Sequence, residues 1–466
     1  METLEQILQT CSDFIWGVPM IVLLFGTHIF LTFRLRFIQK HTFRAIRLSV
    51  TPDKGAKGDI SQFGALATAL AATIGTGNIV GVSTAIALGG PGAVLWCWLT
   101  GVFGIATKYA EALLSVKYRT VNGKGETVGG PMYVIENGLR CKWLAVIFAL
   151  FTVFATFGAG CTVQSHAITG VIETTFHVNP VISGLVVTVL AAVVILGGIK
   201  TISNVCEKLV PFMSLFYILG CLTILWINRS FLLPAVALIL KSAFTARAAA
   251  GGFIGSTILT ACRYGVARGL FSNESGLGTA PIAAACAKTK NPVRQALVSM
   301  TGTFWDTVIV CAMTGIVIVS SILHVPDRFQ SAADDALTQI AFAQLPGIGS
   351  YILTIALSIF AFTTILGWAY YGERSTEYLF GSKVTWIYKV VFLIVLFIGA
   401  VSSLGIVWTF SDLMNGLMAF PNLISLLLLS GVAVKETRHY LWENRLDANN
   451  RDEIDYDEVD ENAENM

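Results

Sequence analysis

Charged residues are scarce in this sequence of 466 residues: Asp, Glu, Lys and Arg make up 13% of it, and hydrophobic residues make up 55%. A soluble chain of this length needs more charged side chains to cover its surface. The mean hydropathy of +0.70 therefore indicates that the solvent is a lipid bilayer. The formal net charge is +2, and nothing in the charge pattern predicts nucleic-acid binding.

Patterns typical of metal sites and enzymes are missing as well. The nine cysteines and six histidines are dispersed, and no CxxC pair occurs. Most of the cysteines stand in apolar runs, where cysteine acts as a small hydrophobe. No Walker loop, catalytic triad or pair of catalytic carboxylates stands out. The sequence thus predicts neither an enzyme nor a cofactor.

Apolar runs long enough to cross a bilayer, about 20 residues each, recur along the chain. The N-terminal segment carries Glu2, Glu5 and Asp13 where a signal peptide is basic, so we expect the first run to remain as a span. We predict an all-α, polytopic membrane protein with about eleven transmembrane helices. The expected spans are residues 14–33, 62–88, 91–116, 142–170, 180–198, 208–228, 262–288, 294–322, 347–371, 385–405 and 409–432.

The loops between these spans differ in basic charge. If the N-terminus lies outside, the cytoplasmic loops hold 24 of the 31 Lys and Arg residues and the outer loops hold four. The positive-inside rule then predicts an outer N-terminus and an inner C-terminus, in a bacterial inner membrane. We expect a single membrane domain over residues 1–442, with a basic interfacial helix within residues 34–48. Residues 443–466 are acidic and predict a disordered cytoplasmic tail.

Two expected spans are interrupted by glycine, in the segments ALAATIGTGNIVGVSTAIALGGP and FSNESGLGTAPIAAACAKTKNP. Close helix packing of the GxxxG type also places glycines in spans. The spacing favours a repeat instead. Pro91 follows Gly75 by 16 residues, and Pro292 follows Gly276 by the same 16.

The offset between the two interrupted segments, 201 residues, applies to the other spans too. It places every span of repeat one (62–228) on a span of repeat two (262–432), with 229–261 as a connector and 14–33 as a leading helix. Each repeat has five spans, an odd number, so the second unit enters the membrane from the opposite side. Inverted repeats that each open with a discontinuous helix are typical of secondary transporters, whose site lies between the breaks.

Four stretches resemble the alanine or glycine to cation symporter family, also called sodium/alanine symporters. They are GTGNIVGV, GGPGAVLWCW, VGGPMYVIENGL and RGLFSNESGLGTAPIAAA. The second departs from the family pattern at Leu95 and Cys97, where the family has Phe and Met. The resemblance extends over nearly the whole chain. It implies a fold like that of the bacterial leucine transporter with one additional helix, and cotransport of sodium with a small neutral amino acid, alanine or glycine.

A zwitterionic amino acid needs partners for both of its charges once it leaves water. Half-helix N-termini offer N–H groups to the carboxylate, and half-helix C-termini offer carbonyls to the ammonium or to a cation. The expected carboxylate ligands in the first break are Gly75, Thr76, Gly77 and Asn78.

The second break and two neighbouring helices supply the rest of the expected substrate site. Trp368 is expected to close the side-chain pocket, unless it is an interfacial tryptophan. Phe157 and Gln164 are candidates on the third core helix, where an aromatic more often serves packing. The expected ammonium ligands are Ser272, Asn273, Gly276 and Gly278.

In this family's fold the sodium site lies between carbonyls of the first broken helix and paired hydroxyls of the eighth core helix, which the resemblance assigns to Thr363 and Thr364. A threonine that bonds back to its own helix is the alternative. The expected carbonyl ligands are those of Ala72, Thr73 and Gly75.

Glu274 lies near mid-membrane, where an ionisable residue is a functional candidate. It could bind the ammonium or a cation, but a structural or gating pair with Arg268 is the favoured interpretation. A proton-coupled carrier would depend on Glu274. A channel would need a continuous polar pore, and a membrane enzyme a catalytic set. Serine, D-alanine or glutamine could replace alanine or glycine as substrate, and we expect the chain to act as a monomer.

Overall fold

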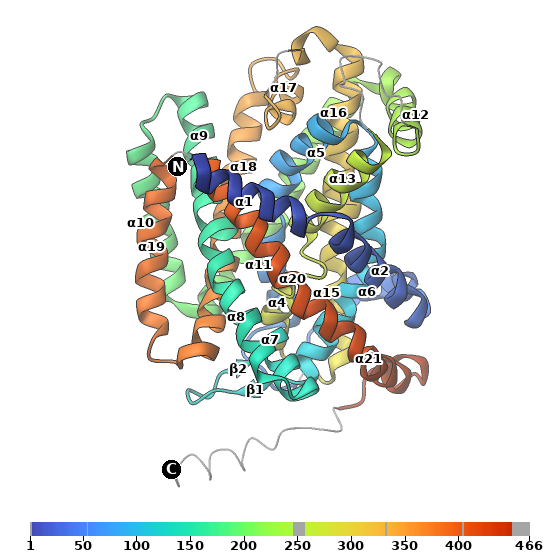
Figure 1. The fold of residues 1–466 in the computed structure, drawn as a ribbon, viewed down its shortest axis with the longest axis vertical. Coiled ribbons are helices and arrows are strands. Elements are labelled where there is room, and N and C mark those ends of the chain that lie inside the picture. The colour runs from blue at the N-terminus through green and yellow to red at the C-terminus, as the bar shows by residue number, and fades with distance from the viewer. Residues whose placement is uncertain (1, 54, 246–256, 331–332, 403–404, 450–466) are drawn as a thin grey trace.

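The computed structural model describes all residues except 1, 54, 246–256, 331–332, 403–404 and 450–466. It is a bundle of helices with one short hairpin (Figure 1). Seven helices in the described part are long and apolar enough to cross a membrane, and α4 (Gln62–Thr73) forms a further span with the helical segment Gly77–Gly89, bent by 49°. Two shorter helices in the described part, α10 (Pro180–Leu196) and α19 (Thr385–Val401), are also apolar.

The leading segment and repeat one occupy the first half of the chain. A bend at Trp16 and Gly17 divides the leading segment into two helices, and the segment predicted as a basic interfacial helix contains η1 and α3. The leading elements are α1 (Glu2–Ile15), α2 (Val18–Arg34), η1 (Ile38–His41) and α3 (Thr42–Ser49). Repeat one comprises α4 (Gln62–Thr73), η2 (Gly77–Gly81), α5 (Val82–Gly89), α6 (Ala93–Lys117), β1 (Thr120–Val121), β2 (Thr127–Val128), α7 (Pro131–Tyr133), η3 (Val134–Gly138), α8 (Lys142–Phe157), η4 (Gly158–Thr162), α9 (Val163–Phe176), α10 (Pro180–Leu196) and α11 (Gly198–Ile227).

A connector and repeat two follow. Each of the eleven predicted spans falls on one helix or on a series of consecutive helices. The connector contains η5 (Arg229–Phe231) and α12 (Leu232–Ser242). Repeat two and the C-terminal elements are α13 (Ile258–Asn273), α14 (Ala280–Ala285), α15 (Pro292–Thr303), η6 (Phe304–Cys311), α16 (Ala312–His324), η7 (Pro326–Phe329), α17 (Leu337–Phe342), α18 (Gly349–Phe380), α19 (Thr385–Val401), α20 (Gly405–Leu428), α21 (Ser430–Thr437) and η8 (Arg438–Trp442).

Local sequence explains where several helices begin. The side chains of Asn179, Thr257 and Asn291 each accept a hydrogen bond from the first turn of α10, α13 and α15. Such N-caps satisfy amide groups that have no partner inside the helix. α10 and α15 also have proline at their start, where a missing N–H costs nothing.

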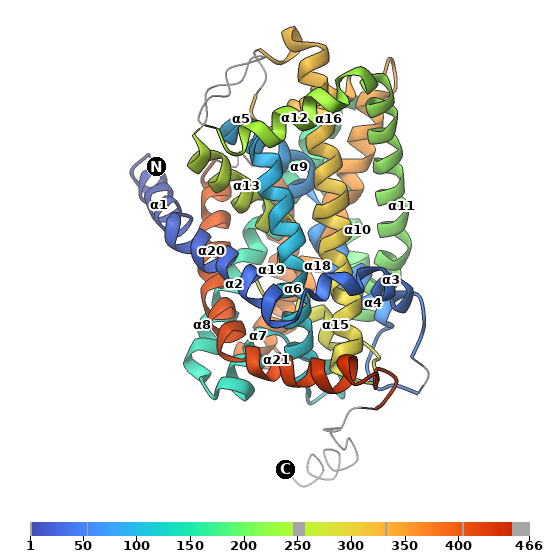
Figure 2. The ribbon, with the colours of Figure 1, turned by 90° about the vertical axis from the view of Figure 1, so that its right-hand side faces the viewer.

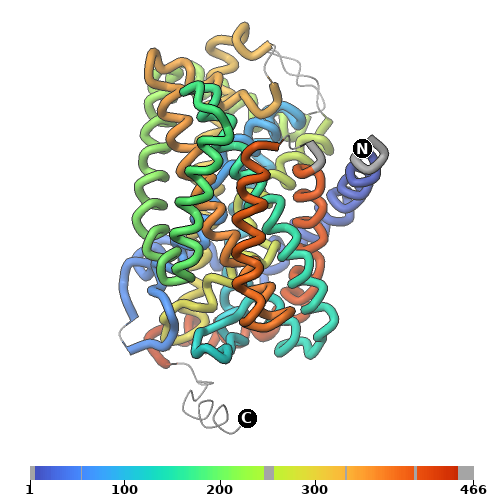
Figure 3. Tube along the Cα trace, turned by 90° about the vertical axis from the view of Figure 1, so that its left-hand side faces the viewer, coloured from blue at the N-terminus to red at the C-terminus, as the bar shows by residue number. Residues whose placement is uncertain are grey.

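The surface of the bundle is apolar where lipid would contact it. α10 and α19 pack side by side at one flank, as two views show (Figures 1 and 3). α10 exposes Leu185, Val189 and Val193, while its Gly184 and Ala191 are buried. α12 lies across one end of the bundle and α21 lies at the other (Figure 2). We call these the α12 end and the hairpin end, the latter also carrying β1 and β2.

The hairpin end is filled by hydrogen bonds and ion pairs. Arg119 donates to the carbonyls of Ala285 and Ala287 at 3.2 and 2.9 Å. Ile60, just before α4, forms a parallel bridge with Ala287. Arg374 of α18 pairs with Glu126 in the β1–β2 hairpin at 2.8 Å. The start of α4 and the end of α14 are therefore held together here.

The start of the C-terminal tail is not free of the bundle. Asn291 donates to the carbonyls of Leu446 and Ala448 at 2.8 and 2.9 Å, and Asp447 pairs with Arg294 at 2.6 Å. Leu446 is buried. Residues 446–448 of the predicted disordered tail thus contact the bundle, and residues 450–466 lie outside the described part of the chain.

Candidate functional site

The first broken helix contains a small cavity where its regular hydrogen bonding stops. α4 ends at Thr73, Ile74 is extended, and η2 begins at Gly77. The cavity measures about 10 Å³, room for about one water molecule. It is lined by Ala72, Thr73, Gly75, Thr76, Gly77, Ala159, Gln164, Phe271, Thr364 and Trp368.

This cavity joins several residues that the sequence predicted as ligands. Gly75, Thr76 and Gly77 line it, and Gln164 and Trp368 reach it from α9 and α18. Thr76 is the N-cap of η2 and Gly77 is its first residue, so their amide groups have no carbonyl partner inside that helix. With the positive end of the helix dipole, they form a position suited to a carboxylate.

Gln164 lies directly over the break. Its Nε2 donates to the Thr76 hydroxyl at 3.0 Å and to the Ala159 carbonyl at 2.9 Å. Its Oε1 is buried and has no hydrogen-bond partner. A buried acceptor left in this state is costly, so it is a position where a donor such as an ammonium group would be stabilised.

Trp368 forms a wall of the cavity, whereas Phe157 does not. A Cβ on Gly160 would lie 2.2 Å from the Trp368 Cβ, so only glycine allows the indole to sit there. Phe157 is directed at α19 and packs on Tyr388 and Phe392, with ring centroids 5.6 and 6.1 Å apart. Phe157 therefore does not line this cavity, whereas Phe271 of α13 does.

A cluster of four oxygens lies where α18 crosses the end of α4. Thr363 and Thr364 both donate to the Phe360 carbonyl, at 2.9 and 3.0 Å, and Thr364 also reaches the Ala71 carbonyl at 3.1 Å. Both threonines thus bond back to their own helix, and Thr364 in addition joins two helices. The cluster contains Ala71, one residue before the carbonyls predicted at Ala72, Thr73 and Gly75.

The second break provides less of the cavity than expected. Its backbone turns through three positive φ values, 55° at Glu274, 103° at Gly276 and 85° at Gly278. Gly276 is held between Glu111 and Asn422, which accept from its N–H and donate to its carbonyl. None of these residues lines the small cavity.

The polar side chains that end α13 are also turned away from the cavity. Ser272 donates to the Asp306 carboxylate, at 3.1 and 2.9 Å. Asn273 accepts from the Ser275 N–H at 2.8 Å and lies 3.5 Å from the Thr100 hydroxyl. The predicted ammonium site at Ser272, Asn273, Gly276 and Gly278 is therefore not assembled in this conformation.

The predicted pair of Arg268 and Glu274 is wrong. Arg268 binds Asp412 of α20 at 3.3 Å and lies beside Phe271 and Trp408. Glu274 accepts a hydrogen bond of 2.5 Å from Thr279 and is buried. The helix ends between positions 268 and 274, and the αL conformation of Glu274 turns its side chain away from Arg268.

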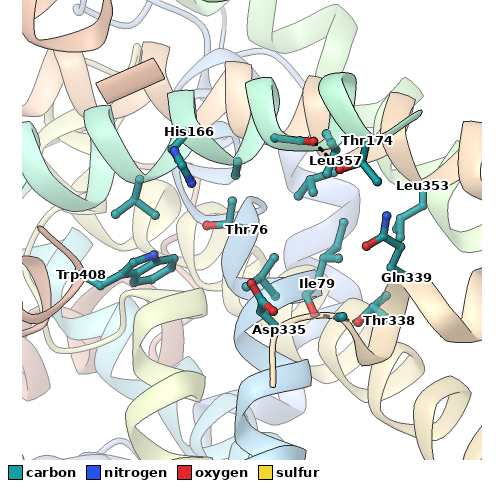
Figure 4. Close-up of a pocket in the computed structure, with 16 residues that line it drawn as sticks. Thr76, Ile79, His166, Thr174, Asp335, Thr338, Gln339, Leu353, Leu357 and Trp408 are labelled. Atoms are coloured by element: carbon teal, nitrogen blue, oxygen red, sulfur yellow. Dashed lines mark hydrogen bonds between the residues drawn. The ribbon is translucent and has the colours of Figure 1, made fainter. Parts of the chain in front are cut away.

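A second cavity of about 240 Å³ extends from Thr76 toward the α12 end (Figure 4). Thr76 lies beside His166 and Trp408 at one end of it, and Gln339 and Leu353 lie at the other. α17 closes over part of it, because Thr338 donates to the Ile79 carbonyl at 2.8 Å. Thr76 lines both cavities, so the two lie next to each other at this residue.

Sequence comparison places the chain among known proteins. Residues 1–454 match the sodium:alanine symporter family. The chain belongs to the sodium:alanine symporter family. The sodium/alanine symporter AgcS of Methanococcus maripaludis is 51% identical over 441 residues, which are 93% of this chain and 96% of that protein. An uncharacterized transporter of Haemophilus influenzae is 49% identical over 457 residues, 97% of this chain and 99% of that one.

The fold is shared with solved structures of much lower identity. The structure of MhsT in complex with L-phenylalanine matches with a TM-score of 0.55 and 14% identity, over 82% of this chain and 98% of that one. The fold class predicted from the sequence, a leading helix plus a 5+5 inverted repeat like that of the leucine transporter, is confirmed. As a member of the sodium:alanine symporter family, the chain is a multi-pass membrane transporter and not an enzyme.

Sequence reasoning missed or misread several residues of this family member. Ala71, Ala159, His166, Phe271 and Trp408 gave no signal, because small and aromatic residues are common in any span. Asp306 is visible in the sequence as a carboxylate inside the predicted span 294–322, but sequence spacing does not show that its partners are Asn78 and Ser272.

Proposed function

We propose that this symporter carries alanine or glycine together with sodium, by alternating access around the first helix break. The observation that supports this most is the small cavity at Thr76 and Gly77, bordered by the oxygen cluster of Thr363 and Thr364. Substrate and ion positions that share one broken helix allow the binding of each to favour the other.

The substrate carboxylate would bind the N–H groups of Thr76 and Gly77 and the Thr76 hydroxyl. Its ammonium would bind Gln164 Oε1, the buried acceptor without a partner, and the last carbonyls of α4. Trp368 would face the substrate side chain. A cavity of about 10 Å³ has to expand to admit even glycine. Each methylene added to the substrate side chain would require further expansion of the cavity. This limit favours small substrates over serine or glutamine.

Sodium would bind the hydroxyls of Thr363 and Thr364 with the carbonyls of Phe360 and Ala71. Each hydroxyl can turn its proton away and present a lone pair to a cation. Ala72 packs directly on Gly367, where a Cβ would lie within 3.0 Å of three Ala72 atoms, so α4 and α18 are close enough to share one ion.

The two ends of the bundle support alternating access. The larger cavity opens toward the α12 end, while Arg119 and Arg374 hold the hairpin end closed. With the N-terminus outside and the C-terminus inside, as the basic loops predict, this conformation would face outward across a bacterial inner membrane. The next step would be rocking of one helix group against the other.

The test is uptake of a labelled amino-acid panel by proteoliposomes that contain the full chain. An inward sodium gradient should drive alanine and glycine uptake, with serine and glutamine much slower. A proton gradient in sodium-free buffer should drive none. Equal uptake without sodium, or preference for a larger amino acid, would overturn the proposal. Glu274→Gln should remain sodium-driven, and its failure alone would favour a proton-coupled carrier.

A further inference from the structure

An apolar groove of about 320 Å³ lies between α4 and α11, bordered by α3 and η6. Phe63, Leu66, Ala67, Leu70 and Ile74 line one side of it, and their spacing is that of one face of a helix. From position 63 to position 74 a helix rises about 16 Å, which is half of a hydrocarbon core about 30 Å thick. The groove is therefore as long as one leaflet is thick, and Ile74 at its end is the extended residue of the first break.

The groove is open at the lipid-facing surface and closed at its floor. Leu215 of α11 and Val50 after α3 are 59% and 68% exposed, whereas Ala67 and Ile74 are each 1% exposed. An open apolar groove in contact with a bilayer will not stay empty, because its walls would lose their dispersion contacts on one side. A hydrocarbon chain is the occupant that the bilayer supplies.

The helix beside the mouth of this groove carries basic side chains. α3 lies against α4 at the edge of the bundle (Figure 2), and its Ile46 lines the groove. Lys40, Arg44 and Arg47 are exposed, and they follow each other by four and three residues, so they share one helix face. Within the described residues, none of the three forms an ion pair with a carboxylate. These charges are free to meet an anion at the membrane surface.

The charge of these side chains selects the headgroup of the occupant. The basic loops predict that this end of α4 lies on the cytoplasmic side, where the inner leaflet carries anionic lipids. An anionic phospholipid could place its phosphate at Arg44 and Arg47 and one acyl chain between α4 and α11. A free phosphate would leave the groove unfilled, and a zwitterionic lipid would gain little from the basic side chains.

We propose that this groove binds an anionic phospholipid of the inner leaflet, with its phosphate at Arg44 and Arg47 and an acyl chain along α4 as far as Ile74. The inference goes beyond the proposed function, since the groove shares no lining residue with the two cavities at Thr76. The chain would support α4 directly before the break. A lipid that binds only the folded chain stabilises it by mass action.

The experiment measures the melting temperature of the full chain in mild detergent against added dioleoyl phosphatidylglycerol. The melting temperature should rise by a few degrees and saturate, while dioleoyl phosphatidylcholine, which has the same chains, should raise it much less. Arg44→Gln with Arg47→Gln should increase the lipid concentration that gives half of the rise about 30-fold. Arg140→Gln with Lys383→Gln is the matched control and should leave that concentration unchanged, because both side chains are exposed and neither lines the groove.

A second pair of variants tests the place of the acyl chain. Leu215→Trp adds bulk inside the groove and should remove most of the rise in melting temperature. Leu219, one turn further along α11, is similarly exposed but does not line the groove, so Leu219→Trp should keep the full rise. Glycerol phosphate, which has the headgroup without the chains, should have no effect. If Leu215→Trp does not fold, the charge variants still decide the proposal.

Several results would overturn the lipid site. Phosphatidylcholine could stabilise the chain as strongly as phosphatidylglycerol, which would show that the basic side chains do not select the lipid. Leu215→Trp could behave like Leu219→Trp, which would place the lipid elsewhere. Stabilisation by glycerol phosphate alone would indicate a free-anion site, and a dimer that Leu215→Trp dissociates would indicate a second copy of the chain in the groove. None of these results bears on sodium-driven uptake, so the two proposals fail separately.

Discussion

Removing the Thr364 hydroxyl tests the sodium site most directly. Thr364→Val keeps the size and branching of the side chain and deletes one oxygen from the cluster. That oxygen joins α18 to the Ala71 carbonyl at 3.1 Å. Its loss takes one ligand from the proposed sodium and leaves the buried carbonyl without its partner, at a cost of about 1–3 kcal/mol.

If this cost falls on the sodium-bound state, the half-saturating sodium concentration should rise about 5- to 150-fold. The assay is the initial rate of alanine uptake by proteoliposomes over a range of sodium concentrations. Thr364→Ser retains the oxygen and should stay close to the unaltered chain. Maximal uptake should largely return when sodium saturates the valine variant, because the substrate ligands are intact.

Thr223→Val is the matched control. Thr223 is exposed on α11 and donates only to the carbonyl of Leu219, at 2.8 Å, so it also bonds back to its own helix. Its replacement should leave sodium dependence unchanged. The reasoning is refuted if Thr364→Val has the sodium dependence of the unaltered chain, or if Thr223→Val alters it equally.

Three further predictions concern the pocket wall and the two ends of the bundle. Gly160→Ala places a Cβ 2.2 Å from the Trp368 Cβ, so alanine affinity at saturating sodium should fall, and unchanged binding would remove Trp368 from the pocket. Arg268→Gln breaks a mostly buried ion pair with α20 and leaves Asp412 without its charged partner, so it should cost about 1–3 kcal/mol in stability while altering alanine counterflow; normal counterflow would exclude a gating role. Burial alone would raise the pKa of Glu126, but Arg374 beside it lowers that pKa below its ordinary value. The stabilisation is therefore present above the ordinary carboxyl pKa of about 4.3 and lost as pH falls through the lower folded value, so Glu126→Gln should flatten the acid side of a melting-temperature profile.

The sequence alone determined the number and order of the spans, the positions of the two breaks and the inverted repeat. These features are local: an apolar run has to match the bilayer thickness, and glycine or proline interrupts a helix wherever it stands. Gly75 and Gly276, 201 residues apart, were therefore readable without any knowledge of packing. Family motifs added the threonine pair on α18, which composition could not have distinguished from ordinary helix threonines.

Only the tertiary structure decided which partner each polar side chain takes. Arg268 binds Asp412, 144 positions away, in preference to the nearby Glu274, and Asn78 meets Asp306 across 228 positions. Such choices depend on how each helix is rotated about its axis. The π-helical turn η4 shifts that rotation within α8 and α9, so Phe157 faces α19 while Gln164 faces the break. Sequence spacing cannot give this rotation, because it is fixed by the packing of all the neighbouring helices at once.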